Sequence, residues 1–291
     1  MVLKSMSEIY EECRRSGLPF WEVILRYDMD DRQVTREESI GKMLITWQAM
    51  QDASDSYTGT RKSVSGMVGG EGMRMKQYNL RGNGLCSGYI GEVMAEALCM
   101  AESNACMRRI VACPTAGSCG VMPAVLLPLM RREDITQKQI IEAFYVACGV
   151  GMVIADRACI AGATGGCQAE IGTASAMAAA ALVKLKGGSD ELIAQAVSIA
   201  LSNLMGLVCD PVAGLVEVPC VKRNVIGALN AVSAADMALA GIESIIPVDE
   251  VIDAMAEVGR RMPVDYKETA TGALANTPTG RAIRERIWSK E

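Results

Sequence analysis

The stretch from 171 to 185 most constrains how this chain can fold, because it consists almost entirely of Ala, Met, Ser, Thr and Val. A second segment with helical character follows, from 190 to about 207. Helices with such small side chains can approach until their backbones lie close together, so we expect this pair at the centre of a domain. Half of the residues are apolar but only 4% are aromatic, which favours packed helices over a β-sandwich. The sequence therefore predicts an all-α, multi-helix domain.

The domain organisation is predicted to be simple, because the chain has no internal repeat and no low-complexity linker. Residues 1–60 are expected to form an N-terminal helical region, in which Thr35 and Glu38 make a capping box that opens one helix. Residues 61–291 are expected to form the main helical domain, which can be continuous with 1–60. The stretch 65–84 holds six glycines and few apolar anchors, so we predict no regular element there. It is either a mobile surface loop or backbone that lies close to a ligand.

The charge and the cysteine content limit the partners and the compartment. A formal net charge of -5 argues against nucleic acid and anionic membranes as partners. Two uncharged runs, 110–130 and 192–209, are interrupted by prolines and glycines or by polar residues, so we expect buried segments of a soluble protein and no membrane span. The chain has an odd number of cysteines, 11, and no basic-then-apolar leader, which predicts a reduced cytoplasmic protein.

Three of the cysteines, Cys167, Cys209 and Cys220, stand beside glycine or proline, where the chain turns. Thiolates in such loops can be aimed at one shared point, which suggests a metal site. A closed structural site takes four protein ligands, whereas three ligands leave one position open for a substrate. The other eight cysteines are expected to be structural.

A loop of small residues, 114–120, precedes a predicted helix that begins at Val121. Its backbone N–H groups and its Thr and Ser hydroxyls could bind a carboxylate or a phosphate, helped by the helix dipole. A simple turn between helices explains the same pattern. The charged segment 222–224 follows Cys220 and could orient a substrate beside a metal, or it could be an ordinary capped turn.

The chain contains no histidine. Enzymes that transfer protons near neutral pH use histidine most often. The general base must therefore be another group of this chain, a bound water, or a residue of a second polypeptide.

Four motifs in order carry a resemblance to a known family. These are Ala112-Cys113-Pro114-Thr115-Ala116-Gly117-Ser118-Cys119-Gly120, Gly166-Cys167-Gln168-Ala169-Glu170, Cys209-Asp210-Pro211-Val212-Ala213-Gly214 and Val218-Pro219-Cys220-Val221-Lys222-Arg223-Asn224. Together they resemble the α chain of the iron-sulfur L-serine dehydratases, or L-serine ammonia-lyases. The resemblance implies an all-helical catalytic domain with glycine-rich ligand loops. It also implies a [4Fe-4S] cluster on Cys167, Cys209 and Cys220, spaced 42 and then 11 positions apart, with one iron left without a protein thiolate.

The resemblance further implies a lyase of amino-acid degradation and gluconeogenesis that converts L-serine to pyruvate and ammonia without pyridoxal phosphate. In this family the proposed catalytic histidine lies in a β region, fused in some members and a separate chain in others. This chain has no histidine, so a heterodimer with a β subunit is expected. The candidate catalytic residues are Thr115, Ser118 and Lys222. The candidate substrate-binding residues are Thr115, Gly117, Ser118, Gly120, Arg223 and Asn224.

Two alternative functions remain open from the sequence. A related [4Fe-4S] lyase, such as an L-cysteine desulfidase, would use the same iron to activate a thiol leaving group. A non-catalytic metal-binding or interaction protein, with zinc on the same thiols, belongs to a different class.

Overall fold

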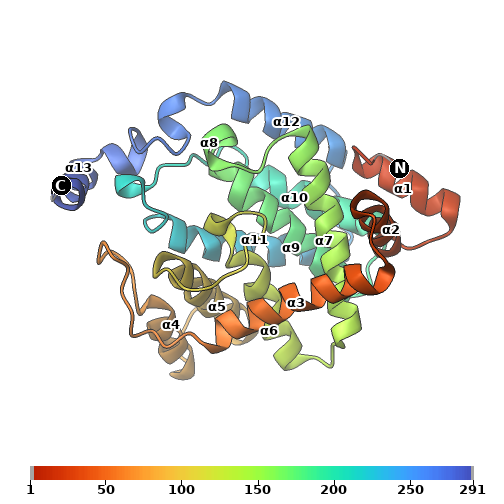
Figure 1. Cartoon of the computed structure of the whole chain (residues 1–291), viewed down its shortest axis with the longest axis horizontal. Helices are drawn as coiled ribbons and strands as arrows, with labels where there is room; N and C mark the ends of the chain where they lie inside the picture. The colour runs from red at the N-terminus through yellow and green to blue at the C-terminus, as the bar shows by residue number, and fades with distance from the viewer. Residues whose placement is uncertain (1–2, 290–291) are drawn as a thin grey trace.

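The computed structural model describes residues 3–289, and within that range the regular elements are helices joined by turns and loops (Figure 1). The prediction of an all-α fold is confirmed, since the only β-type pairing in the described range is an isolated bridge between Cys209 and Lys267. The 13 α-helices are α1 Met6–Ser16, α2 Phe20–Arg32, α3 Arg36–Asp55, α4 Glu71–Leu80, α5 Gly88–Ala105, α6 Val121–Arg132, α7 Gln137–Arg157, α8 Gly162–Gly165, α9 Thr173–Leu185, α10 Asp190–Leu204, α11 Cys220–Leu239, α12 Val248–Arg261 and α13 Pro278–Trp288. Short helices join them: η1 Ala116–Ser118, the π-helix η2 Gln168–Gly172, η3 Val212–Gly214, η4 Val264–Tyr266 and η5 Ala273–Asn276.

Helix α9 is the centre of the molecule, as its small side chains predict. Every residue from Thr173 to Val183 is buried, and α6, α7, α10 and α11 pack around it (Figure 1). Four consecutive alanines, from Ala178 to Ala181, let these neighbours approach closely. The second predicted helix, α10, ends at Leu204, three residues before the expected end. The segment after Leu204 leads directly to Cys209.

The N-terminal helices share this core. Helix α2 buries Phe20 and Leu25 against α7, and Trp47 of α3 lies 5.6 Å from the ring of Phe144. The predicted capping box is present, because the Thr35 side chain accepts the Glu38 N–H while the Glu38 carboxylate accepts the Thr35 N–H. The apolar contacts of residues 1–60 that fall in the described range are therefore continuous with those of the main domain.

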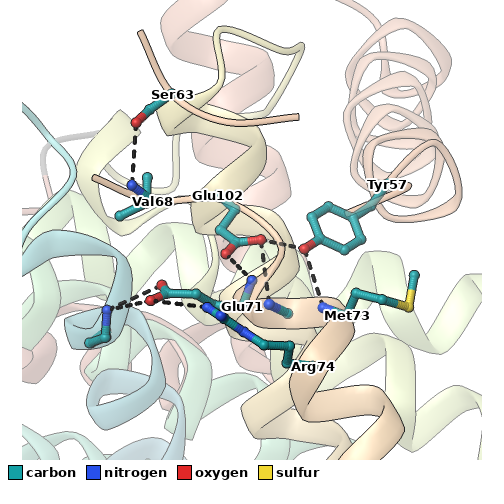
Figure 2. A network of polar contacts seen from close by, with 9 residues as sticks. Tyr57, Ser63, Val68, Glu71, Met73, Arg74 and Glu102 are labelled. Atoms are coloured by element: carbon teal, nitrogen blue, oxygen red, sulfur yellow. Dashed lines mark hydrogen bonds and ion pairs between the residues drawn. The ribbon is translucent and has the colours of Figure 1, made fainter. Parts of the chain in front are cut away.

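The prediction of no regular element in 65–84 is wrong, because α4 lies inside it. Figure 2 shows the reason: the buried carboxylate of Glu102 accepts the N–H of Glu71 at 2.6 Å and of Gly72 at 3.4 Å, and Tyr57 donates its hydroxyl to the same group. A carboxylate at a helix N-terminus satisfies free N–H groups and interacts favourably with the helix dipole. Gly72 also permits close packing, since a Cβ there would lie 2.6 Å from the Cys99 sulfur.

One described helix, α7, is long and apolar enough to cross a membrane by length and composition. Two thirds of its most apolar window, 67%, is buried inside the protein, where it packs on α9 and α2. It is therefore a core helix. The two uncharged runs noted in the sequence, 110–130 and 192–209, cover most of α6, which is largely buried, and most of α10, which buries one face.

Candidate functional site

The three predicted ligand cysteines come from three different elements. Cys167 directly precedes the π-helix η2. Cys209 lies in an extended segment, and its N–H donates to the Tyr266 carbonyl at 2.8 Å. Cys220 is the first residue of α11, not part of a loop as the sequence predicted, because Pro219 starts the helix directly before it. Two of the three thiols thus stand at the beginning of helical segments, where the backbone dipole favours a thiolate.

The structure brings these three thiols into one neighbourhood. Cys167 and Cys209 are each 3% exposed, and Cys220 is partly buried. Burial is the main cause that raises the pKa of Cys167 to about 12 and of Cys220 to about 12. Burial also raises the pKa of Cys209 well above its usual value, with a further rise from the charge of Cys167. A buried site that disfavours three thiolates in this way suits a positively charged group that binds them as thiolates.

The arrangement of the thiols does not by itself form a metal site. Between residues 3 and 289 no set of three His, Cys, Asp or Glu side chains lies close enough together to hold a metal ion. A metal group on Cys167, Cys209 and Cys220 therefore stays a prediction. The donor set of three thiols fits an iron-sulfur cluster, whose irons are held by cysteine thiolates, although zinc sites use thiolates as well.

Arg223 provides positive charge beside this site. Its side chain is 14% exposed, lies 2.7 Å from a carboxylate oxygen of Asp210, and donates to the Val208 carbonyl at 2.7 Å. Its proximity also lowers the pKa of Cys167, although less than burial raises it. Arg223 therefore connects the segment before Cys209 with the first turn of α11.

Asn224 connects the same helix with the 114–120 loop. Its side chain is buried, accepts the Gly120 N–H at 2.9 Å and donates to the Gly117 carbonyl at 2.8 Å and to the Cys220 carbonyl at 3.0 Å. The Asn224 amide thus bonds to three backbone groups of the protein, two in the loop and one in α11. Asn224 holds the loop against the start of α11, and its predicted contact with substrate stays a prediction.

Inside the loop, the hydroxyl of Ser118 is fully buried and accepts the Thr115 N–H at 3.3 Å while lying 3.2 Å from the Cys113 carbonyl. Thr115 is less buried, and its side chain interacts with the carboxylate of Glu170 and lowers the pKa of that group. Ser118 therefore shapes the loop in this structure, whereas Thr115 faces a neighbouring acid. Their predicted catalytic and substrate-binding roles stay predictions.

Lys222 lies at the surface, with its side chain 60% exposed. Its amine pairs with Glu71 at 2.9 Å, at the start of α4. Glu217, two residues before Pro219, accepts hydrogen bonds from the hydroxyls of Ser63 and Ser65. The segment that carries Cys220 is thus attached on both sides to the glycine-rich region, which was not evident from the sequence.

Glu170 is a site residue to which the sequence gave no role of its own. A Cβ on Gly117 would lie 3.3 Å from one of its carboxylate oxygens, and a Cβ on Gly162 would lie 2.8 Å from the other. The same Gly162 Cβ would lie 3.0 Å from the sulfur of Cys209. Glu170 therefore lies between the 114–120 loop and a predicted ligand. Its position in the Gly166–Glu170 motif was the one signal that could have identified it.

The fold and this site define an all-helical protein with a buried three-thiol site beside a small-residue loop. The family model described as "Serine dehydratase alpha chain" matches residues 15–275. The chain is 43% identical to the "Probable L-serine dehydratase, alpha chain" of Bacillus subtilis, over 99% of this chain and 96% of that protein. It is 42% identical to the "L-serine dehydratase, alpha chain" of Peptoniphilus asaccharolyticus, over 97% of each. The "L-serine dehydratase" of Streptomyces coelicolor is 37% identical, over 92% of this chain and 59% of that protein.

The chain therefore belongs to the serine dehydratase alpha chain family. The matches to the two alpha chains cover nearly the whole length of those proteins. The match to the Streptomyces protein covers 59% of it, so that protein extends beyond the matched region.

Proposed function

We propose that this chain is the α chain of an L-serine dehydratase, a lyase that converts L-serine to pyruvate and ammonia. The observation that supports this most is that Cys167, Cys209 and Cys220 share one buried site in a chain matched from end to end by L-serine dehydratase alpha chains. The name alpha chain supports a β subunit as partner. A cytoplasmic heterodimer without pyridoxal phosphate stays our prediction.

The residues present fit a [4Fe-4S] cluster on these three cysteines. When bound there, the cluster would supply one iron without a protein thiolate, which can act as a Lewis acid on the hydroxyl of serine and so weaken its bond to the β-carbon. The protein's own part begins with electrostatics. Arg223 places a cation beside Cys167 and, through Asp210 and Val208, fixes the chain that leads to Cys209.

The 114–120 loop is the part of the site that we assign to the substrate carboxylate. Within residues 3–289 the N–H groups of Ala116 and Gly117 donate no hydrogen bond, and the neighbouring Thr115 hydroxyl is partly exposed. Asn224 holds the loop in place by binding Gly117 and Gly120. Free N–H donors in a preformed loop can bind a carboxylate with little loss of entropy.

Elimination removes the α-proton and the β-hydroxyl of serine and yields aminoacrylate. This product tautomerises to an imine, which water hydrolyses to pyruvate and ammonia, so the reaction needs no external oxidant or reductant. The chain has no histidine to accept the α-proton. We assign the general base to the β subunit, which would have to reach the exposed side of the site.

The test is an anaerobic assay of the reconstituted complex of this chain with a β subunit. Pyruvate released from L-serine is compared with sulfide released from L-cysteine at equal concentrations. The proposal predicts that pyruvate from L-serine dominates and that this chain alone, without the β subunit, is much less active. Dominant release of sulfide would instead assign the site to a cysteine desulfidase.

A further inference from the structure

The position of Glu170 is unusual among the carboxylates of the interior. One of its oxygens faces Gly117 in the loop, and the other faces Gly162 beside the sulfur of Cys209, as the contacts of a Cβ at either glycine show. A side chain at either glycine would press on this carboxylate. The two glycines therefore allow Glu170 to lie at the point where the loop and a predicted cluster ligand meet.

Other acidic groups of the interior have strong partners. Glu22 binds Arg36 through two hydrogen bonds, Asp210 pairs with Arg223, and Glu96 pairs with Arg131. Glu102 instead accepts backbone N–H groups and a tyrosine hydroxyl. Each of these partners compensates for the loss of hydration that a carboxylate suffers on burial.

Glu170 has weaker partners, because within residues 3–289 no lysine or arginine lies at ion-pair distance from it and no backbone N–H donates to it. The Thr115 side chain is the one group that favours its charged form, whereas burial and the nearby Glu268 oppose that form. A cation beside Glu170 would therefore be favoured.

The amino-acid substrate brings such a cation. In L-serine the α-ammonium and the carboxylate are attached to the α-carbon, and the hydroxyl is attached to the adjacent β-carbon. If the carboxylate binds the 114–120 loop and the hydroxyl faces the cluster, the α-carbon that carries the ammonium lies between the loop and Cys209, in the region where Glu170 is located. We propose that Glu170 binds the α-ammonium group of the amino-acid substrate. This inference rests on the proposed function, because it assumes an amino acid at the cluster site.

The proposal is tested by binding, so that no turnover is required. L-serine and 3-hydroxypropionate, which has the same carboxylate and hydroxyl but no ammonium, are titrated into the anaerobic αβ complex, and the change in iron-sulfur absorption is followed. Glu170→Gln preserves size and the contact with Thr115 but removes the charge. We expect this change to weaken L-serine binding by about 10- to 100-fold, in line with loss of a charged hydrogen bond, and to leave 3-hydroxypropionate binding within about threefold.

Glu268→Gln is the matched control. It removes an exposed negative charge that acts on both Glu170 and Cys209, and it should change neither affinity by more than about threefold. Equal weakening of both ligands by Glu170→Gln, or an equal effect of Glu268→Gln on L-serine, would overturn the proposal. Loss of iron and sulfide from Glu170→Gln would overturn it too, since Glu170 would then serve the cluster. Failure of the wild-type complex to form pyruvate would refute the proposed function instead, and binding of amino acids could still be measured.

Discussion

The side chain of Asn224 accepts the N–H of Gly120 at 2.9 Å, and so fixes the 114–120 loop to the helix that begins with Cys220. A second hydrogen bond, from the same amide to the Gly117 carbonyl at 2.8 Å, closes the connection. The loop that we assign to the substrate and a predicted cluster ligand thus belong to one rigid unit.

Asn224→Ala should be strongly destabilising, because it leaves the buried N–H of Gly120 and the carbonyl of Gly117 without a partner. We expect the free energy of unfolding in urea to fall by about 2–4 kcal/mol. Asn203→Ala is the control: Asn203 is exposed and donates only to Asn230, so its loss should cost less than about 1 kcal/mol. Similar losses for the two variants would contradict the role given to Asn224.

Glu102→Ala should destabilise the glycine-rich region, because the carboxylate accepts the first N–H groups of α4 (Figure 2). Loss of a buried helix-capping group should lower the free energy of unfolding by about 1–3 kcal/mol and increase hydrogen exchange in 71–80. Glu92→Ala on the same helix α5 removes a more exposed ion pair with Arg132, for which we expect less than about 1 kcal/mol. Unchanged exchange in α4 after Glu102→Ala would argue against this cap.

Glu22 should give the stability a measurable pH dependence. Two hydrogen bonds from Arg36, at 2.6 and 2.7 Å, hold the pKa of Glu22 below its usual value. The Glu22 carboxylate therefore binds a proton less tightly in the folded state than in the unfolded state. The resulting stabilisation is complete above the unfolded pKa of about 4.3 and is lost as the pH falls through the lower folded pKa. Glu22→Gln should cost about 1 kcal/mol at neutral pH and progressively less in acid. Urea unfolding across this pH range measures the difference in free energy of unfolding between the wild type and Glu22→Gln. A difference that does not change with pH would refute the role of the Glu22–Arg36 pair.

Gly162→Ala should disturb the cluster site while leaving most of the fold intact. The added Cβ would lie 2.8 Å from Glu170 and 3.0 Å from the Cys209 sulfur, so the site must shift at a cost of about 1–3 kcal/mol. The iron and sulfide content of Gly162→Ala after anaerobic reconstitution should therefore be lower than that of the wild type. At Gly41 in α3 a Cβ meets nothing within 4 Å, and Gly41→Ala should stabilise the helix by about 0.5–1 kcal/mol with full iron content. Full loading of Gly162→Ala would contradict this picture of the site.

Local patterns predicted the features of the fold that depend on neighbouring residues. The alanine-rich run 171–185 correctly indicated the central helix α9, and Thr35 with Glu38 correctly indicated the start of α3. Both signals arise within a few positions of the chain. The proximity of the three cysteines was predicted from their loop positions together with the family resemblance, because no local pattern reports distances across 53 residues of chain, from Cys167 to Cys220.

Features that depend on distant contacts could not be predicted. Helix α4 is stabilised by Glu102, which lies 31 positions after Glu71 and belongs to another helix. Glu170 was visible only as part of a motif, since its relation to Gly117 and Gly162 exists only in three dimensions. The glycines of 65–84 suggested irregular backbone, but Gly72 serves close packing against Cys99 within a helix.

The iron and acid-labile sulfide content per chain shows whether Cys167, Cys209 and Cys220 together hold one [4Fe-4S] cluster. The anaerobically reconstituted αβ complex should contain about four of each, as should Cys13→Ala and Cys99→Ala, whose thiols are buried elsewhere in the protein. Cys167→Ala, Cys209→Ala and Cys220→Ala should each lose the cluster and, with it, pyruvate formation. Wild-type iron and sulfide in Cys209→Ala would contradict the claim.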